Sequence, residues 1–253
     1  MNIKEIHKFL VNFLNVEITK SGFYKAIIGI SGGVDSAVSV YLAVEALGKE
    51  NVFGVVLPYK TSSPISIADA QLVINTLGIR NKTIDITPMV DEFLKVDPDM
   101  SRLRLGNIAA RARMIVLYDL SAKENALVIG TSNKTEILLG YGTLFGDTAS
   151  AINPLGDLYK TQIWDLAKES GVPENIISKI PTADLWTGQT DEGELGFLYK
   201  DVDKLFTEMI DNQKTDVELA AAGFEKEFIN KVRLRISKYE FKRRLPLIAK
   251  LPG

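Results

Sequence analysis

Four short apolar segments alternate with segments of helical periodicity in the first half of the chain, and this alternation limits the fold more than any other feature. The apolar segments are residues 26–30, 52–57, 82–86 and 126–130. The helical segments between them are residues 34–48, 66–78 and about 105–122. Continuous apolar runs are typical of strands that are buried on both faces of a parallel sheet. We therefore predict an α/β fold, a doubly wound parallel sheet with helices on both faces.

Helical patterns dominate the remainder of the chain. The predicted helices are residues 2–20, 160–171, a short one starting at Val172-Pro173, 196–212, 215–222, and 225 to about Pro246. Residues 130–160 are rich in glycine, threonine, serine and asparagine, and they carry few signals of helix or strand. No repeat or convincing linker divides the sequence. We expect residues 1–253 to form one domain, with a nucleotide-binding core at about 20–180 and a helical C-terminal part at about 196–253.

Composition excludes several classes of chemistry. The 253 residues contain 46% hydrophobic and 25% charged residues, which is normal for a globular protein. Because the chain has no cysteine, it has no thiolate zinc site, iron–sulfur cluster or cysteine nucleophile. A net charge of −2 argues against a nucleic-acid partner or an anionic membrane surface. The N-terminus does not resemble a signal peptide, and no apolar run approaches a membrane span. We expect a cytoplasmic protein.

The first strand leads into the sequence GISGGVDS at residues 29–36, which is the strongest local signal. Ligands of doubly wound sheets bind beyond the carboxyl ends of the strands. Glycines let the backbone approach a ligand closely, and the N-terminus of the following helix favours an anion. A tight strand-to-helix turn is the simpler alternative. The spacing fits neither a Walker loop nor a dinucleotide fingerprint. The carboxylate of Asp35 suits an anion site only where a metal cation bridges the two.

SGGVDS resembles the pyrophosphatase loop, Ser-Gly-Gly-x-Asp-Ser, of enzymes that bind ATP and release its pyrophosphate whole. The resemblance implies an adenine nucleotide alpha-hydrolase-like fold. Members include GMP synthetase, asparagine synthetase, tRNA-modifying thiolases and NAD synthetase. The sulfur-inserting members generally use cysteines, and members with their own glutaminase use a cysteine on an additional domain. This chain contains neither the cysteine nor the additional length.

Further motifs in the same order resemble the ammonia-dependent NAD synthetases over roughly residues 1–250. They are LPY (57–59), GNIAARARM (106–114), GTSNKTE (130–136), NPLGDLYKTQIWDLAK (153–168), IPTADLW (180–186) and FKRRLP (241–246). This resemblance implies a C–N ligase that amidates deamido-NAD with ammonia, uses ATP and Mg²⁺, and forms AMP and pyrophosphate through an acyl-adenylate. It further implies the last step of NAD biosynthesis and a homodimer whose interface helps to build the dinucleotide site.

The resemblance also implies roles for individual residues near ATP. The expected ATP contacts are Gly29, Ile30, Ser31, Gly32, Gly33, Val34, Asp35, Ser36, Thr131, Lys160 and Thr182. Asp35 and Glu136 are the expected Mg²⁺ ligands, and Asp35 and Lys160 are the expected catalytic residues. Each residue type also has an ordinary structural explanation. Aspartate and glutamate at a helix start complement the dipole, lysines are mostly solvated, and threonine before a helix is often a cap.

Substrate contacts are less completely matched. Arg111, Phe241 and Lys242 correspond to deamido-NAD contacts, but many relatives have histidine where this chain has Phe241. Relatives also place a lysine and an aspartate where this chain has Leu144 and Ala151. We expect Asp147 to take over part of that role. Arg113 points away from the face of Arg111 and is expected to be solvated or salt-bridged, and the single histidine, His7, is expected to be structural or exposed.

Two classes of alternative remain open from the sequence. One is another AMP-forming amide ligase of this fold, such as a separate ATPase subunit of GMP synthetase. The other is a module that binds adenine nucleotides without chemistry. For the ligase, water must be kept from the adenylate, and the polar segments 60–66 and 184–196 are the expected lids.

Overall fold

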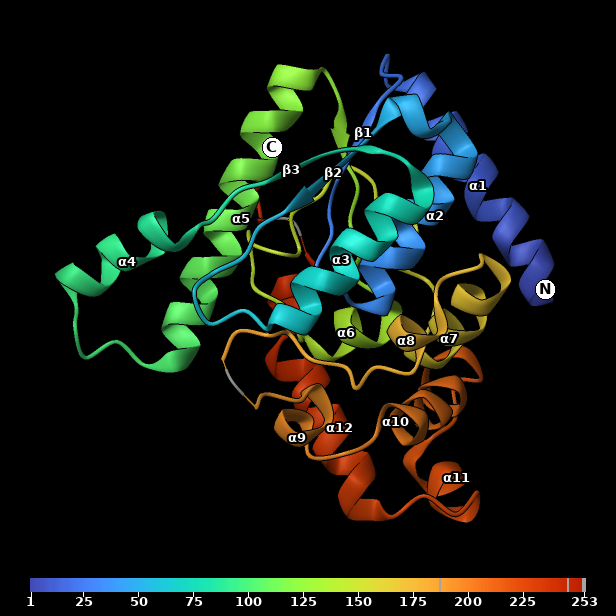
Figure 1. Ribbon diagram of the computed structural model, residues 1–253. Coiled ribbons are helices and arrows are strands. Elements are labelled where there is room, and N and C mark those ends of the chain that lie inside the picture. The colour runs from blue at the N-terminus through green and yellow to red at the C-terminus, as the bar shows by residue number, and fades with distance from the viewer. Residues whose placement is uncertain (187, 245, 252–253) are drawn as a thin grey trace.

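The computed structural model describes residues 1–186, 188–244 and 246–251. Its centre is a parallel four-stranded sheet in the order β3–β2–β1–β4 (Figure 1). The strands are β1 (Ala26–Gly29), β2 (Val52–Val56), β3 (Arg80–Thr83) and β4 (Leu127–Val128). Ala26 lies opposite both Val52 and Leu127. A parallel bridge between Ile129 and Ile152 continues the β4 side of the sheet. The predicted α/β class is confirmed.

Helices surround the sheet and form the C-terminal part of the molecule. They are α1 (Ile3–Lys20), α2 (Val34–Leu47), α3 (Pro64–Leu77), α4 (Thr87–Val96), α5 (Arg102–Glu124), α6 (Lys134–Leu139), α7 (Lys160–Glu169), α8 (Glu174–Ile177), α9 (Asp191–Leu195), α10 (Tyr199–Phe206), α11 (Asp216–Ala221) and α12 (Lys226–Lys238). Three shorter turns are η1 (Lys49–Asn51), η2 (Thr207–Asp211) and η3 (Glu240–Arg243).

Successive side chains of β1 enter different hydrophobic cores. Ile28 packs into a core formed with α1, α2, α3, α7 and α8, whereas Ile27 packs into a core formed with α4 and α5. This alternation follows from the two-residue period of a strand and places helices on both faces of the sheet. Figure 1 shows α2 and α3 on one side of the strands and α5 on the other.

A third hydrophobic core holds the C-terminal helices together. Tyr199 and Phe206 are buried at its centre, among side chains from α9, α10, α11 and α12. Leu139 of α6 and Tyr159 also belong to it, and Trp164 of α7 packs against both this core and that of α1 and α2. The C-terminal helices therefore lie against the end of the sheet where the strands finish, as Figure 1 shows below the strands.

Element boundaries differ from the sequence predictions in several places. The strand predicted at 82–86 lies at Arg80–Thr83, and all four residues are exposed because β3 is the sheet edge. The strand predicted at 126–130 shortens to two residues. Helix α5 starts earlier than predicted because Ser101 caps it, accepting a hydrogen bond from the Arg104 N–H at 3.4 Å. The predicted C-terminal helix ends at Lys238 and is followed by η3.

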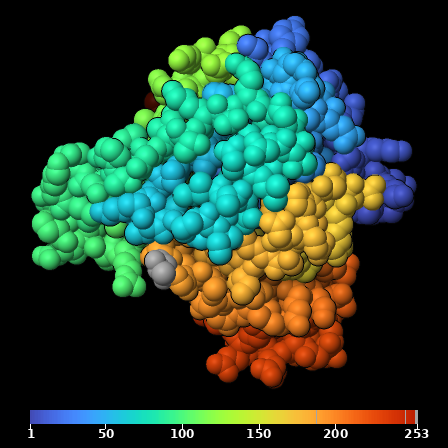
Figure 2. Space-filling view, in the orientation of Figure 1, coloured from blue at the N-terminus to red at the C-terminus, as the bar shows by residue number. Residues whose placement is uncertain are grey.

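Three helices were missed by the sequence patterns. They are α4, α6 and α9. Helices α6 and α9 have only six and five residues, which is too short for a helical period to repeat. Helix α4 projects from the body together with the start of α5, and Figure 2 shows them as a separate lobe. Within the described residues, no helix is long and apolar enough to cross a membrane.

Candidate active site

A cavity of about 670 Å³ opens at the carboxyl ends of β1, β2 and β4. Its wall includes loop residues after β1, Val55 and Leu57 at the end of β2, and Gly130 after β4. Helix α5 and the segment 180–186 close two further sides. This is where the doubly wound topology predicts a ligand site, and the volume suits a nucleotide-sized molecule.

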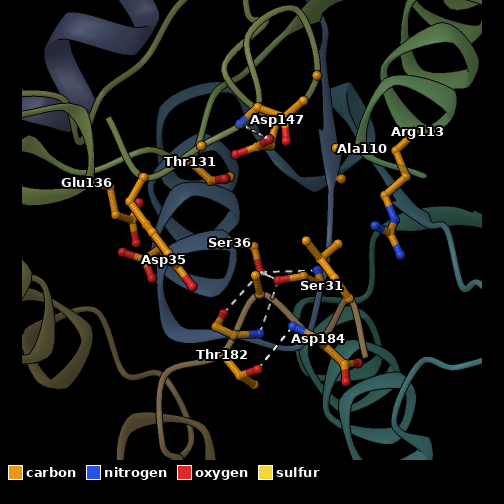
Figure 3. Close-up of a pocket in the computed structure, with 18 of the residues that line it drawn as sticks. Ser31, Asp35, Ser36, Ala110, Arg113, Thr131, Glu136, Asp147, Thr182 and Asp184 are labelled. Carbon is orange, nitrogen blue, oxygen red and sulfur yellow. Dashed lines mark hydrogen bonds between the residues drawn. The ribbon is translucent and has the colours of Figure 1, made fainter. Parts of the chain in front are cut away.

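The serines of the loop after β1 form hydrogen bonds within the loop itself. The Ser31 N–H donates to Ser36 Oγ at 3.2 Å, and Ser36 Oγ donates to the carbonyl of Gly33 at 3.0 Å. Gly33 begins α2 without a side-chain cap, so the first N–H groups of that helix are left for another acceptor. Ser31, Ser36 and the first residues of α2 line the cavity, where hydroxyl and N–H donors suit an anion (Figure 3).

Gly32 has a positive φ of +79° and lies against helix α3. A Cβ atom at this position would be 2.1 Å from the carbonyl oxygen of Ser66. Only glycine fits both this backbone conformation and this approach. Gly32 is therefore a support of the loop, and it does not line the cavity itself.

A cluster of opposite charges lies beside the loop. The buried ammonium group of Lys160 is 2.5 Å from Asp35 Oδ2 and 3.5 Å from Glu136 Oε1. The Asn133 amide donates to the other oxygen of Asp35 at 2.9 Å. Figure 3 shows Asp35 and Glu136 next to each other on one wall. The first turns of α2, α6 and α7 thus each contribute one charged group to the same corner of the cavity.

Burial and neighbouring charges perturb these groups strongly. Burial, together with the charge of Asp35, raises the pKa of Glu136 to about 8, although Lys160 opposes the shift. Burial disfavours the Lys160 ammonium, but Asp35 and Glu136 outweigh this effect and raise its pKa above the ordinary value. Perturbed groups gathered in a cleft are typical of functional sites.

A second layer fixes the position of Lys160. Its backbone N–H donates to Thr135 Oγ1 at 3.0 Å, and Thr135 Oγ1 donates to Asp203 Oδ1 at 2.5 Å. The other oxygen of Asp203 accepts from the Thr161 N–H at 2.8 Å. The ammonium group also lies 5.3 Å from the ring centre of Tyr199. The start of α7 is therefore tied to both α6 and α10.

The opposite end of the cavity contains Asp147, Lys242 and Arg113. Lys242 Nζ donates to the carbonyls of Gly140 and Gly142 at 2.9 and 2.6 Å. Burial raises the pKa of Asp147, and the nearby Lys242 charge partly offsets the shift. Arg113 approaches from α5 and donates from Nε to the Leu57 carbonyl at 2.9 Å. Figure 3 shows Arg113 on the wall opposite Asp35 and Glu136.

The two predicted lid segments contact each other at the cavity. The Ser63 N–H donates to Asp184 Oδ2 at 2.9 Å, and Thr61 Oγ1 donates to the Leu185 carbonyl at 3.3 Å. Thr182 Oγ1 accepts from the Asp184 N–H at 3.0 Å. Thr187, which belongs to the second predicted lid, lies outside the described residues. The segments 60–66 and 184–186 are thus joined by hydrogen bonds.

Most of the predicted ATP and metal residues line this one cavity. They are Gly29, Ile30, Ser31, Gly33, Val34, Asp35, Ser36, Thr131, Glu136, Lys160 and Thr182, and Lys242 joins them at the far end. Asp147, the proposed substitute for the lost substrate contacts, also lines it. The motif residues therefore converge in space as well as in sequence.

Arg111 and Phe241 do not line the cavity of the single chain. Arg111 is exposed and donates from Nε to the Leu144 carbonyl at 3.2 Å. Phe241 is 59% exposed. Their assignment to the substrate stays a prediction. Leu144 and Ala151 also lie outside the cavity wall, and Nε2 of His7 on α1 lies 3.2 Å from Glu45 Oε2.

Several charged residues of the cavity wall were not assigned to it by sequence reasoning, among them Arg113, Lys179 and Asp191. Arg113 was expected to be solvated or salt-bridged, but it is half-buried, and burial lowers its pKa. Lys179 and Asp191 received no role. Asp191 accepts from Tyr141 and Tyr199 at 3.0 and 3.1 Å. A lysine two residues before the matched IPTADLW proline offered a weak signal for Lys179, and nothing in the spacing indicated its partners.

A parallel sheet with this loop at the end of β1 and a carboxylate–lysine cluster beside it defines a nucleotide-binding protein of the adenine nucleotide alpha-hydrolase fold. Comparison with known proteins identifies the particular family. The family model described as NAD synthase matches residues 6–246. The chain belongs to the NAD synthase family.

Curated relatives and solved structures agree with this assignment. The chain is 53% identical to the NH3-dependent NAD(+) synthetase of Trichlorobacter lovleyi, covering 100% of this chain and 93% of the relative. It is 51% identical to the NH3-dependent NAD(+) synthetase of Fusobacterium nucleatum, covering 99% of this chain and 97% of that relative. The NH3-dependent NAD synthetase of Campylobacter jejuni superposes with a TM-score of 0.84 at 36% identity, over 99% of this chain and 100% of that one. The NMN synthetase of Francisella tularensis gives 0.88 at 34% identity, with the same coverage.

Proposed function

We propose that the protein is an ATP-dependent C–N ligase that converts deamido-NAD and ammonia into NAD, AMP and pyrophosphate. The observation that carries this proposal is the meeting of the anion-binding loop with Asp35, Glu136 and Lys160 in one cavity. Family membership and relatives of about 50% identity that are named NH3-dependent NAD(+) synthetases support the same activity. This reaction forms NAD and therefore ends a route of NAD biosynthesis.

The chemistry begins with activation of a carboxylate. A nicotinate carboxylate is a poor electrophile, so one of its oxygens attacks the α-phosphorus of ATP and displaces pyrophosphate. Ammonia then attacks the carbonyl of the acyl-adenylate, loses a proton and displaces AMP. Lys160 offsets the charge that develops on the departing pyrophosphate, and the serines and N–H groups of the loop position its oxygens.

Mg²⁺ fits the carboxylates of this site. Asp35 and Glu136 are hard oxygen donors that converge on one buried cation, Lys160. The raised pKa of Glu136 indicates that this lysine alone does not satisfy the pair. Asp35 and Glu136 would hold the ion, which when bound supplies positive charge beside the phosphate oxygens of ATP.

The nitrogen enters as ammonia. The chain contains no cysteine that might hydrolyse glutamine. It matches only 47% of the glutamine-dependent NAD+ synthetase of Acinetobacter baumannii, although the match covers all of this chain. We accordingly propose no glutaminase function for this chain.

Exclusion of water falls to the two segments above the cavity. The hydrogen bonds from Thr61 and Ser63 to Leu185 and Asp184 support a joint lid made of segments 60–66 and 184–196. Such a lid protects the adenylate from hydrolysis. We propose that the two segments open and close together.

We further propose that the chain acts as a homodimer and as a single functional unit over residues 1–253. Ile115 and Tyr118 follow Arg111 by one and two turns of α5, and both are exposed. Phe145 and Phe241 are also exposed, and each is next in sequence to a residue near Arg111, namely Leu144 and Lys242. We infer that these four residues form an apolar patch around Arg111. A patch of this kind is typical of a subunit interface. A partner at this position would bring Arg111 and Phe241 next to the substrate. The demand for ATP and the absence of cysteine favour a cytoplasmic setting.

Product analysis tests the proposed reaction. Incubation with ATP, Mg²⁺, deamido-NAD and ammonium should yield NAD, AMP and pyrophosphate in equal amounts. Replacing deamido-NAD with XMP tests the GMP synthetase alternative, and replacing it with nicotinate mononucleotide tests the activity named for the Francisella tularensis neighbour. Both should give much less AMP. Formation of ADP and orthophosphate, or ATP binding with no turnover, would contradict the proposal.

A further inference from the structure

Lys179 lines the cavity and contacts the pyrophosphate loop, and the reaction described above gives it no role. It follows α8 and precedes the segment that carries Thr182. Its Nζ donates to the carbonyl of Gly32 at 3.3 Å, to Ser66 Oγ at 3.1 Å and to Asp69 Oδ2 at 2.9 Å. The ammonium group therefore joins three segments that are far apart in the sequence.

The position of Lys179 is itself fixed by buried partners. The side chain of Asp69 is only 9% exposed, and its second oxygen accepts from the Asn175 amide at 2.9 Å. Asn175 belongs to α8, four residues before Lys179. Helices α3 and α8 thus present one satisfied ion pair to the loop. A charge-assisted pair with this degree of burial costs a great deal to break on one side only.

The carbonyl of Gly32 is the part of the loop that Lys179 holds. Among the described residues no peptide bond is cis. In a trans peptide the C=O and the N–H point in opposite directions. When the Gly32 carbonyl points back to Lys179, the N–H of Gly33 must therefore point forward. Gly33 lines the cavity, and its N–H meets only Ser31 Oγ, at 3.3 Å.

A peptide between two glycines resists rotation less than any other, because neither residue carries a Cβ. Ser66 blocks one side of Gly32 through its backbone carbonyl, but it makes no hydrogen bond that fixes the direction of the Gly32 carbonyl. In the described structure that hydrogen bond comes from Lys179. Lys179 is thus placed to decide which way the Gly32–Gly33 peptide faces.

We propose that Lys179 is a positioning residue that holds the Gly32–Gly33 peptide with its N–H turned into the cavity, where it donates to the β- or γ-phosphate oxygens of ATP. Asp69 acts in turn by holding Lys179. This inference rests on the proposed use of ATP. It concerns the binding of the triphosphate alone, since Lys179 donates to Gly32 of the loop and to Ser66 and Asp69 of α3.

Direct contact of Lys179 with a phosphate is the competing explanation, and the two differ in what Asp69 does. If Lys179 acts through the loop, removal of the Asp69 charge releases its anchor and weakens triphosphate binding. If Lys179 instead swings onto the phosphate, Asp69 competes for the ammonium group, and its removal strengthens binding. The sign of the effect of Asp69→Asn therefore separates the two.

Calorimetric binding to the full-length protein with Mg²⁺ provides the test. The probes are α,β-methylene-ATP, which cannot release pyrophosphate, and AMP and deamido-NAD, which have no γ-phosphate. Lys179→Met keeps the side-chain length and removes the charge. We expect the Kd for α,β-methylene-ATP to rise about ten-fold, because one charge-assisted hydrogen bond to the loop is lost. The Kd values for AMP and deamido-NAD should stay within about two-fold of wild type.

Three further variants complete the design. Asp69→Asn should weaken binding of α,β-methylene-ATP by about three-fold, and the double variant should match Lys179→Met alone, because the two residues act in series. Lys168→Met, at an exposed lysine of α7, should change nothing. In steady-state assays Lys179→Met should raise the KM for ATP and leave the KM for deamido-NAD unchanged.

Several outcomes would overturn the proposal. They are tighter binding in Asp69→Asn, unchanged triphosphate binding in Lys179→Met, or equal weakening of all three probes, which would indicate general loss of structure. If Lys179→Met fails to fold, Asp69→Asn still decides the sign, because it conserves volume. A failure of wild type to form AMP and pyrophosphate would refute the proposed reaction, whereas the binding of α,β-methylene-ATP judges Lys179 independently.

Discussion

At the residue scale, the site is dominated by three carboxylates gathered around one ammonium group. The charges of Asp35, Glu136 and Asp191 all raise the pKa of Lys160. The carboxylates also repel one another, because Asp35 raises the pKa of Glu136 and of Asp191, and Asp191 raises that of Glu136. Such an arrangement is unfavourable without a further cation, and it suits a site that binds one together with its substrate. The folded chain therefore sacrifices some stability at this cluster for function.

Glu136→Gln should separate stability from activity. The amide keeps an oxygen that can accept the Asn133 N–H, now bonded to Glu136 Oε2 at 3.3 Å, and removes a buried acid with a pKa of about 8. Without Mg²⁺ and ATP, we expect the Tm to rise by a few degrees, since about 1 kcal/mol shifts the Tm of a protein of this size by about 2–4 °C. Turnover should fall by about 10²-fold or more, because one of the proposed Mg²⁺ ligands is lost.

The stability gain of this variant should depend on pH. The pKa of Glu136 is raised from 4.5 in the unfolded chain to about 8 in the folded one. Between these values the folded protein binds more protons, so the stability of wild type falls as the pH rises. Scanning fluorimetry should show a larger Tm difference at pH 8 than at pH 5. A constant difference across this range would contradict the assignment of the shift to Glu136.

Glu218→Gln is the matched control for this variant. Glu218 occupies the same capping-box position in α11 that Glu136 occupies in α6, but it is exposed. Hydrogen bonds from Thr215 lower its pKa, so the carboxylate is favoured there. The control should keep full activity and show a slightly lower Tm. Equal behaviour of the two variants would place the effect in the helix cap instead of the cavity.

Sequence reasoning recovered the residues that belong to contiguous motifs and missed those whose partners are remote. Ser31, Asp35 and Lys160 follow from motif resemblance, and the structure brings all three to one cavity. Lys179 and Arg113 instead bond to backbone carbonyls of distant segments, at Gly32 and Leu57. No spacing or periodicity specifies such a pairing, because it arises only when the elements pack.

At the element scale, short helices around the cavity do more positioning than their length suggests. Helix α6 has six residues, yet it places Glu136 in the cavity and Thr135 under Lys160. Its capping box was visible in the sequence as Asn133 and Glu136. The glycine- and threonine-rich surroundings concealed it. Strand β3 was predicted too far along the chain, at 82–86, because the prediction relied on apolar residues. An edge strand needs backbone pairing and little apolar burial, and β3 lies at the exposed residues Arg80–Thr83.

Gly140→Ala should destabilise the protein through the end of α6. Gly140 has φ of +61°, and a Cβ there would lie 2.2 Å from Cβ of Tyr239. The change adds backbone strain and forces apart α6 and the segment after α12. We expect a loss of unfolding free energy on the order of 3 kcal/mol, measured by urea denaturation.

Gly171→Ala separates the two causes. Gly171 also has a positive φ, +79°, but nothing lies within 4 Å of the position of its Cβ. It should therefore lose only about 1 kcal/mol, which is the cost of the left-handed conformation. If both variants lost the same amount, the contact with Tyr239 would carry no energy, and the packing explanation would be wrong.

At the scale of the whole molecule, the alternating pattern of strands and helices was sufficient to predict the sheet class, because it depends on local periodicity. The way in which the C-terminal helices cover the carboxyl end of the sheet was not predictable from that pattern. Trp164 packs against two cores, and Asp203 of α10 holds both Thr135 and Thr161. These contacts join distant segments, and they complete the cavity on the side of Lys160.

The inferred apolar patch near the substrate end of the cavity is the physical argument for a functional dimer. Ile115 is 54% exposed, Phe145 58% and Phe241 59%, and Arg111, one turn before Ile115 on α5, is exposed as well. Arg111 is close enough to Lys242 to help lower the pKa of that cavity lysine, although burial is the larger cause. The patch and the cavity are therefore neighbours.

Ile115→Glu should dissociate the dimer and remove activity together. A carboxylate at the centre of an apolar interface remains unpaired and costs several kcal/mol on association. Light scattering after gel filtration should give twice the mass of one chain for wild type and the mass of one chain for the variant. The circular dichroism spectrum of the variant should be unchanged, which would show that it is folded. Val217→Glu, at an apolar position on α11 that is 80% exposed, should remain dimeric and active. A monomeric Ile115→Glu protein with full turnover would show that one chain contains the complete site, and the assignment of Arg111 and Phe241 to an intersubunit substrate site would then be wrong.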